Sequence, residues 1–257
     1  MKNLFSLSKK DVKKAPLEDV TTLCENMHFT AKEAYKLLRT NLSFTLVSDK
    51  PCKVIGVTSA NRGEGKSTTS INMAYTFAQS GKKVLLIDAD MRLPSIANKL
   101  NLKNKKGLSD YIVGSAPKKD VTLQYKNMEN FHIILSGSLP PNPSELLGSE
   151  KMVSVVERLN RYYDYIILDL PPVNIVTDAL VAKELVDGLV LVVRENYSNK
   201  RSLNACIKAI GFLEIPLLGL VLTDSTSNEV YRHKKVGIYP YDKYVGYKGH
   251  YKKESEQ

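Results

Sequence analysis

The sequence predicts an α/β fold whose mostly parallel sheet is covered by helices on both faces. Two observations support this prediction: strand-sized runs alternate with helix-compatible segments, and the runs are continuously apolar, as in strands buried on both sides. The predicted strands are Lys53–Thr58, Lys83–Asp88, Phe131–Leu135, Tyr165–Asp169, Leu189–Arg194 and Leu217–Leu222. The predicted helices between them are Lys66–Ser80, Lys151–Arg161, Thr177–Val186 and Lys200–Phe212. A chain of 257 residues can hold one large domain of this class, or at most two small ones.

A further helix is predicted ahead of the first strand. Thr30 would cap it, with Glu33 three residues later completing a capping box, and Ala34, Leu38 and Leu42 would form its core-facing stripe. Residues 1–28 are polar, lysine-rich and aperiodic, which is typical of a flexible basic arm. We therefore expect a nucleotide-binding domain over 29–228 and a tail over 229–257.

Composition indicates a cytoplasmic protein. No segment resembles a signal peptide, and the longest apolar runs are far shorter than the ~20 residues of a membrane span. Cys24, Cys52 and Cys206 form no paired motif, which fits a reducing compartment, and the four histidines show no metal-ligand spacing. The net charge of +10 is concentrated at the two ends. This positive charge could bind nucleic acid or an anionic membrane, or could simply keep the ends soluble. No helix-turn-helix or base-stacking motif accompanies the charge, so nucleic acid is not expected as a partner.

The segment after the first predicted strand has the pattern of a phosphate-binding loop. A buried strand runs into Gly63-Glu64-Gly65-Lys66-Ser67, and a helix begins at once. The glycines let backbone N–H groups surround phosphate oxygens, and the helix N-terminus adds partial positive charge. Lys66 would bridge the β- and γ-phosphates. The residues expected to contact ATP are Ala60, Asn61, Arg62, Gly63, Glu64, Gly65, Lys66, Ser67 and Thr68, with Ala60 in place of the first glycine of the motif.

Three carboxylates follow predicted strands. Asp88 and Asp90 stand at the end of one strand and Asp169 at the end of another, at the sheet edge where α/β proteins bind ligands. Each alone could simply cap a turn. Together with the phosphate-binding loop they predict a Mg²⁺ site made by Ser67, Asp90 and Asp169.

Phosphoryl transfer requires positioning, charge neutralisation and a group that orients the nucleophile. Lys66 and Mg²⁺ would neutralise charge, and Asp88 or Asp90 would accept the proton of a phenol, or of water in an ATPase. Arg92 would hold the carboxylates or the transferred phosphate, unless it forms only a surface salt bridge. The predicted catalytic residues are Lys66, Asp88, Asp90 and Arg92.

The tail is unusually rich in tyrosine. Its last 19 residues contain Tyr239, Tyr241, Tyr244, Tyr247 and Tyr251. Disordered segments normally lack aromatic residues. The cluster could stack on nucleic acid or a membrane, but phenols attached to an ATP site are better interpreted as phosphoacceptors.

These motifs resemble those of the bacterial tyrosine kinases of capsule and exopolysaccharide synthesis, of the CpsD type found in Gram-positive bacteria. Three segments are similar to the Walker A, A′ and B motifs, and a fourth to a proline-rich family loop: Ser59–Thr68, Leu86–Pro94, Ile166–Pro172 and Gly137–Leu147. The resemblance implies an ATP-dependent protein-tyrosine kinase that phosphorylates its own tail in trans and regulates polysaccharide synthesis and export.

The same resemblance implies partners. Glu33, Lys36 and Arg39 match an E-x-x-R-x-x-R helix that assembles a ring of copies, with Lys36 replacing an arginine. It further implies a membrane adaptor of the polysaccharide chain-length-determinant type, which would recruit the kinase, and a cognate tyrosine phosphatase. Two other departures are Arg62 for a loop proline and Thr223 for an asparagine near the base. The main alternative is an ATPase resembling ParA and MinD, which act on DNA or membranes. The signature lysine of those proteins is replaced here by Asn61, although the adjacent Arg62 could substitute for it, so this difference does not exclude the alternative.

Overall fold

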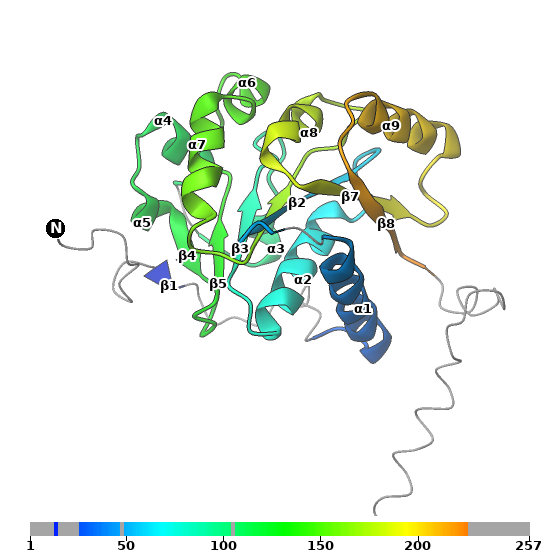
Figure 1. Cartoon of the computed structure of the whole chain (residues 1–257), viewed down its shortest axis with the longest axis horizontal. Coiled ribbons are helices and arrows are strands. Elements are labelled where there is room, and N and C mark those ends of the chain that lie inside the picture. The colour runs from blue at the N-terminus through cyan, green and yellow to red at the C-terminus, as the bar shows by residue number, and fades with distance from the viewer. Residues whose placement is uncertain (1–12, 15–25, 47–48, 104–105, 226–257) are drawn as a thin grey trace, which may run out of the picture. The chain divides into compact units, whose positions relative to one another are not determined.

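The computed structural model describes residues 13–14, 26–46, 49–103 and 106–225. An eight-stranded sheet forms its centre, in the order β1-β4-β5-β3-β6-β2-β7-β8, and every neighbouring pair except β4–β5 is parallel (Figure 1). The predicted α/β class with a mostly parallel sheet is therefore confirmed. The strands are β1 Lys13–Lys14, β2 Lys53–Ser59, β3 Val84–Asp88, β4 Thr122–Gln124, β5 Phe131–Ile134, β6 Tyr165–Asp169, β7 Gly188–Arg194 and β8 Leu217–Thr223.

Helices lie on both faces of the sheet (Figure 1). Helices α1 and α2 cover one face, and α7 and α9 lie on the other. The helices are α1 Phe29–Thr45, α2 Lys66–Gln79, α3 Ile96–Lys99, α4 Leu108–Val113, α5 Lys118–Val121, α6 Pro143–Leu147, α7 Glu150–Leu159, α8 Asp178–Val181 and α9 Lys200–Phe212, with a 3₁₀ turn at Ala182–Leu185.

Two apolar cores hold these layers together, one on each side of the sheet. Side chains of one strand alternate between them: Ile166 and Leu168 of β6 enter the core beneath α7 and α9, whereas Ile167 enters the core beneath α1 and α2. This explains why the central strands are apolar at every position, since burial on both faces leaves no position for a solvated side chain.

The start of α1 differs from the prediction. The helix begins at Phe29, and its N-cap residue, His28, makes no side-chain capping bond. Thr30 lies inside the first turn, where its hydroxyl bonds His28 Nδ1 at 2.9 Å. The predicted capping box is therefore wrong. The stripe is also rotated: Ala34 is exposed, and Tyr35, Leu38 and Leu42 contact the core.

Short elements account for the remaining differences. The predicted helix Thr177–Val186 divides into α8 and the 3₁₀ turn. Lys13–Lys14, predicted to lie within an aperiodic arm, pairs with β4 as an edge strand. Elements of two to six residues such as α4 and β4 give no periodic signal that a sequence pattern can detect.

Cys52 and Cys206 are free and buried, and Cys24 lies outside the described residues. Burial raises the pKa of each of these two thiols to about 12. Among the helices that the structure describes, none has the length and apolarity needed to cross a membrane.

Candidate functional site: a phosphate-binding loop facing three carboxylates

The loop between β2 and α2 has the backbone shape that the sequence predicts. Gly63 and Gly65 have φ of 78° and 95°, in the left-handed region that favours glycine, and Gly65 is the N-cap of α2. A Cβ on Gly65 would lie 3.2 Å from Thr223 Oγ1, so that position also lacks room for a side chain. Ala60 is not among the positive-φ residues and is buried, which explains why this position tolerates alanine.

The three predicted carboxylates do meet at this loop. Asp88 and Asp169 are partners in the β3–β6 register, at the carboxyl edge of adjacent strands. Lys66 Nζ lies 2.8 Å from Asp90 Oδ2 and 4.0 Å from Asp169 Oδ1. The backbone N–H of Leu93 donates to Asp90 Oδ1 at 3.0 Å, which fixes that carboxylate toward the lysine.

Hydrogen bonds from α2 also orient Asp169. Ser70 Oγ donates to Asp169 Oδ1 at 3.0 Å, and Ser67 bonds the same carboxylate. Asp88 Oδ2 accepts the backbone N–H of Ile96 at 3.1 Å, at the start of α3. Neither Asp88 nor Asp169 is exposed to solvent. The site therefore brings together Lys66, Ser67, Asp88, Asp90 and Asp169 as the sequence predicts.

The electrostatic balance of this cluster favours an added cation. Asp88 Oδ1 and Asp169 Oδ2 are buried, and neither has a hydrogen-bond partner among the described residues. Burial raises the pKa of Asp169, and burial together with the charge of Asp169 raises the pKa of Asp88 to about 8. Although burial opposes the charge of Lys66, Asp169 and Asp90 raise the pKa of its ammonium group. One ammonium thus faces three carboxylates.

This donor set fits Mg²⁺ held jointly with phosphate. The described residues contain no group of three or more His, Cys, Asp or Glu side chains that could hold a metal by itself. Magnesium in nucleotide sites is commonly held by one or two carboxylates, substrate phosphates and water, so a complete protein cage is not required. The unpartnered oxygen of Asp169 is a suitable ligand of this kind.

Arg194, Tyr197 and Ser198, at the end of β7 and just after it, hydrogen-bond to the phosphate-binding loop, and we call this group of contacts the brace. The Tyr197 hydroxyl donates to the Arg62 carbonyl at 3.1 Å, and Arg194 Nη1 donates to the Gly63 carbonyl at 3.2 Å. Ser198 Oγ donates to Glu64 Oε1 at 2.6 Å, and Glu64 Oε2 accepts the backbone N–H of Asn61 at 3.0 Å. Glu64 was predicted to contact ATP, but its buried carboxylate is engaged within the loop and with this brace.

Two more hydroxyls complete the brace. Ser202 Oγ donates to Asn61 Oδ1 at 3.0 Å, and Thr223 Oγ1 donates to the Glu64 carbonyl at 2.8 Å. Tyr197, Ser198 and Ser202 are not among the site residues predicted from the sequence. No sequence motif marks them, because their role depends on the chain returning to the loop more than 130 residues later.

Arg92 is engaged by a different carboxylate from the three in the site. Its guanidinium bonds Asp178 through Nε at 2.9 Å and Nη2 at 3.2 Å, and Nη2 also donates to Ser144 Oγ at 2.8 Å. Ser144 donates in turn to Asp178. The Asp178 side chain is 1% exposed and that of Arg92 is 38% exposed, so this ion pair joins a surface guanidinium to a buried carboxylate. It joins the segment after β3 to α6 and α8.

The predicted assembly residues lie on α1, on the opposite face of the sheet from α7. Lys36 Nζ pairs with Glu33 at 2.7 Å, and Arg39 Nη1 donates to the Thr76 carbonyl near the end of α2 at 3.0 Å. The predicted phosphoacceptors Tyr239, Tyr241, Tyr244, Tyr247 and Tyr251 lie outside the described residues.

The fold and this site define a P-loop ATP-binding protein. In agreement, residues 52–214 match the family described as AAA domain. The septum site-determining protein MinD of Pyrococcus horikoshii has a TM-score of 0.56 over 66% of this chain and 70% of its own, but at 22% identity this likeness shows the fold alone.

Proteins with similar sequences and structures identify the family within this class of P-loop proteins. The tyrosine-protein kinase YwqD of Bacillus subtilis is 36% identical over 207 residues, 80% of this chain and 85% of that protein. The tyrosine-protein kinase CpsD of Streptococcus pneumoniae is 40% identical over 195 residues, 75% of this chain and 83% of that protein. The crystal structure of the chimerical protein CapA2B2 has a TM-score of 0.73 and 31% identity, covering 82% of this chain and 92% of that one. The chain belongs to the family of bacterial protein-tyrosine kinases, as the motifs predict.

Proposed function

We propose that this kinase phosphorylates tyrosines of its own C-terminal tail, from one copy to another, and thereby regulates capsule or exopolysaccharide synthesis and export. The catalytic domain would span residues 29–228, and the tail 229–257 would supply the phosphoacceptors. The observation that carries the proposal is the approach of Lys66 to Asp90 and Asp169 at the mouth of a phosphate-binding loop. A tyrosine cluster on the same chain provides the matching acceptor.

The residues of the site have separable roles in this reaction. The N–H groups of the loop over 60–68 would bind the ATP phosphates, and Lys66 would bridge the β- and γ-phosphates. Ser67, Asp90 and Asp169 would hold Mg²⁺. When bound, this ion supplies positive charge to the phosphate oxygens.

Either Asp88 or Asp90 would take the phenolic proton. The two carboxylates differ in the partners of their oxygens. Both oxygens of Asp90 have partners, Lys66 and the Leu93 N–H, whereas Asp88 Oδ1 has none in the described part of the chain. Asp88→Asn and Asp90→Asn should each lower the rate of phosphoryl transfer. Only in the variant that loses the base should this rate no longer rise with pH.

The direct test is incubation of the purified protein with ATP and Mg²⁺, followed by mass spectrometric mapping of phosphate. Phosphotyrosine at Tyr239–Tyr251 is expected. Transfer between copies is tested by mixing a Lys66→Met protein with an active protein whose five tail tyrosines are phenylalanine. Phosphate on the Lys66→Met copies supports transfer in trans. ATP hydrolysis without phosphotyrosine, stimulated by DNA or vesicles, would instead favour the ParA- or MinD-like alternative.

Magnesium use is tested on Asp169. Its carboxylate is fixed by Ser70 and has one unpartnered oxygen, so Asp169→Asn keeps the shape and removes the charge. We expect this variant to require at least tenfold more Mg²⁺ for half-maximal activity. An unchanged Mg²⁺ requirement would contradict this assignment.

Assembly and recruitment complete the proposal. Unphosphorylated copies would form a ring through Glu33, Lys36 and Arg39, and phosphorylation, adding about −1.5 to −2 charges per tyrosine, would release monomers. A membrane adaptor of the chain-length-determinant type would recruit the kinase from the cytoplasm, and a cognate tyrosine phosphatase would reset it. Adding the cytoplasmic segment of the adaptor should raise activity; unchanged kinetics across such a titration would contradict recruitment by that partner.

A further inference from the structure

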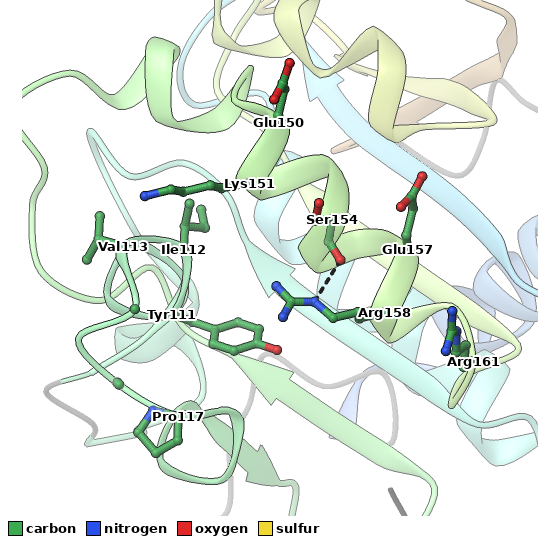
Figure 2. A pocket seen from close by; sticks show the side chains of 12 residues that line it. Tyr111, Ile112, Val113, Pro117, Glu150, Lys151, Ser154, Glu157, Arg158 and Arg161 are labelled. Atoms are coloured by element: carbon green, nitrogen blue, oxygen red, sulfur yellow. Dashed lines mark hydrogen bonds between the residues drawn. The ribbon is translucent and has the colours of Figure 1, made fainter.

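A second candidate binding site lies away from the phosphate-binding loop. An open groove of about 970 Å³ runs between α7 and the segment that contains the end of α4 and the turn to α5. Tyr111, Val113 and Pro117 form one wall, and side chains of α7 form the other (Figure 2). Val113 is 56% exposed and leaves an apolar surface along the groove.

The α7 wall presents positive charge to the groove. Figure 2 shows Lys151 and Arg158 extending from α7 toward the opposite wall; Glu150 and Glu157 also line the groove but point away from that wall. Lys151 and Arg158 are seven residues apart, two turns of helix, and so lie on the same face of α7 about 10 Å apart. Arg161, just beyond the helix, adds a third cation to the lining.

Arg158 is held in a position suited to an anion. Its Nε donates to the Ser154 carbonyl at 3.0 Å, and its guanidinium carbon lies 5.9 Å from the centre of the Tyr111 ring. These contacts fix the stem and one face of the guanidinium. Within the described ranges, its two terminal nitrogens have no carboxylate or carbonyl partner. They are therefore positioned to bind an incoming anion.

A fixed guanidinium beside an aromatic wall suits a phosphate carried on an aromatic ring. Arginine binds phosphate through paired N–H groups, and clustered arginines are a recurring means of phosphopeptide recognition. We propose that the groove between α7 and Tyr111–Pro117 binds the phosphorylated C-terminal tail of this chain through its phosphotyrosines. The source of this ligand rests on the tail phosphorylation proposed above.

The spacing of the tail tyrosines matches that of the cations. Tyr241, Tyr244 and Tyr247 recur every three residues. A peptide bound in a polyproline II conformation repeats every three residues and rises about 9 Å per repeat, so two successive phosphotyrosines would project on the same side. That separation is close to the ~10 Å between Lys151 and Arg158 along α7.

Phosphorylation would also reverse the sign of the electrostatic interaction. The tail segment around these tyrosines carries Lys243 and Lys248 against Asp242, and this net positive charge disfavours approach to a basic groove. Three phosphotyrosines add about −4.5 to −6 charges. The groove would thus distinguish the modified tail from the unmodified one, and would retain it after release from a catalytic site.

Binding is measured with the full chain, treated with a tyrosine phosphatase and held without ATP. The probe is a labelled synthetic peptide of residues 238–251 phosphorylated at Tyr241, Tyr244 and Tyr247. We expect it to bind at least tenfold more tightly than the unphosphorylated peptide and than a peptide with glutamate at the three positions. Because the phosphate is introduced by synthesis, this result is independent of whether the enzyme modifies its tail, which mass spectrometry tests separately.

Two variants assign the binding to the groove. Lys151→Gln combined with Arg158→Gln should weaken phosphopeptide binding at least tenfold, and Tyr111→Leu should reduce the preference over the glutamate peptide. Lys208→Gln, which removes an exposed lysine from α9, is the matched control and should bind like the parent. Circular dichroism and activity on an exogenous tyrosine polymer should be unchanged in all three proteins. Equal binding by parent and double variant, or equal binding of phosphotyrosine and glutamate peptides, would overturn the proposal.

Discussion

The ammonium of Lys66 and the carboxylate of Asp90 form an ion pair of 2.8 Å that joins the phosphate-binding loop to the segment following β3. The two residues are 24 positions apart in sequence and are nearly enclosed, with side-chain exposures of 12% and 4%. Both are among the residues predicted to carry the reaction. The pair therefore sets the position of the lysine relative to the other two carboxylates.

Removing either partner should abolish most of the activity. Lys66→Met should eliminate tail phosphorylation and leave the fold intact, because Lys66 contacts carboxylates rather than the apolar cores. Asp90→Asn keeps the acceptor for the Leu93 N–H and removes the charge, and should lower the transfer rate by about 100-fold or more. Phosphotyrosine formation and near-ultraviolet circular dichroism measure the two effects. Full tail phosphorylation by the Lys66→Met protein would contradict the site assignment.

The pair between Arg92 and Asp178 distinguishes a catalytic from a positioning role for Arg92. Arg92→Ala leaves a buried carboxylate without its cation, so we expect a loss of about 1–3 kcal/mol in the free energy of unfolding. If Arg92 acts only by positioning the segment after β3, Asp178→Ala should lower kcat as much as Arg92→Ala, and the double variant should be no worse. Denaturant unfolding and steady-state kinetics provide the measurements. Normal kcat in Asp178→Ala beside a large loss in Arg92→Ala would instead indicate contact with phosphate.

Single variants on α1 separate assembly from folding. Glu33 and Lys36 form an exposed pair within one helix, worth only about 0.2–0.5 kcal/mol, so Glu33→Ala should scarcely alter stability. Arg39→Ala should cost about 1 kcal/mol, because it removes the bond to the Thr76 carbonyl at α2. If the helix forms the ring, Glu33→Ala should lower the mass measured by light scattering and slow tail phosphorylation at unchanged melting temperature. Thr40→Ala on the same helix is the control. Equal masses for the Glu33→Ala and Thr40→Ala proteins would mean that Glu33 forms only the local salt bridge with Lys36.

The imidazole of His132 should make the stability of the folded protein sensitive to acid. Burial, with a contribution from Lys118, lowers the pKa of His132 to about 4, and its Nδ1 has no partner in the part of the chain that the structure describes. The folded protein therefore binds fewer protons than the unfolded chain between pH 6.5 and 4, and stability falls as pH falls through this range, by up to about 3 kcal/mol.

His132→Phe should remove most of that dependence while preserving a ring against Tyr163, whose centre lies 5.7 Å away. The measurement is the free energy of unfolding in urea at pH 7 and pH 4.5 for parent and variant. The same decrease in both proteins would mean that other groups cause the acid sensitivity.

The sequence predicts the centre of the sheet well because β2, β3, β6 and most of β7 are buried on both faces. Strand Tyr165–Asp169 and helix Lys200–Phe212 have the predicted bounds, and the other five predicted strands differ by one residue at an end, whereas β1 and β4 were not predicted. Asp88, Asp90 and Asp169 were found for the same reason, since carboxyl ends of parallel strands meet at one edge. Local helix signals were less reliable: the start of α1 depends on packing of Tyr35 and Leu38 against the core, which overrides the capping preference of Thr30.

Features that depend on long-range return of the chain could not be predicted. Asp178 is an ordinary helix-start residue in the sequence, and its pairing with Arg92 requires the placement of α8. The brace formed by Tyr197 and Ser198 likewise depends on how β7 and β2 are paired. Spacing along a chain contains no information on such contacts, because each is set by the geometry of the whole sheet.

The hydrogen bond from Thr223 to the Glu64 carbonyl has a kinetic consequence. It anchors Thr223, the last residue of β8, at the phosphate-binding loop, so the chain leaves the sheet beside that loop. Tyr239 lies 16 positions beyond Thr223, a contour length of about 55 Å when extended. That connection does not by itself select between transfer within one chain and transfer to another copy. Reaction order does: dilution slows transfer between free copies in proportion to concentration and leaves transfer within one chain unchanged.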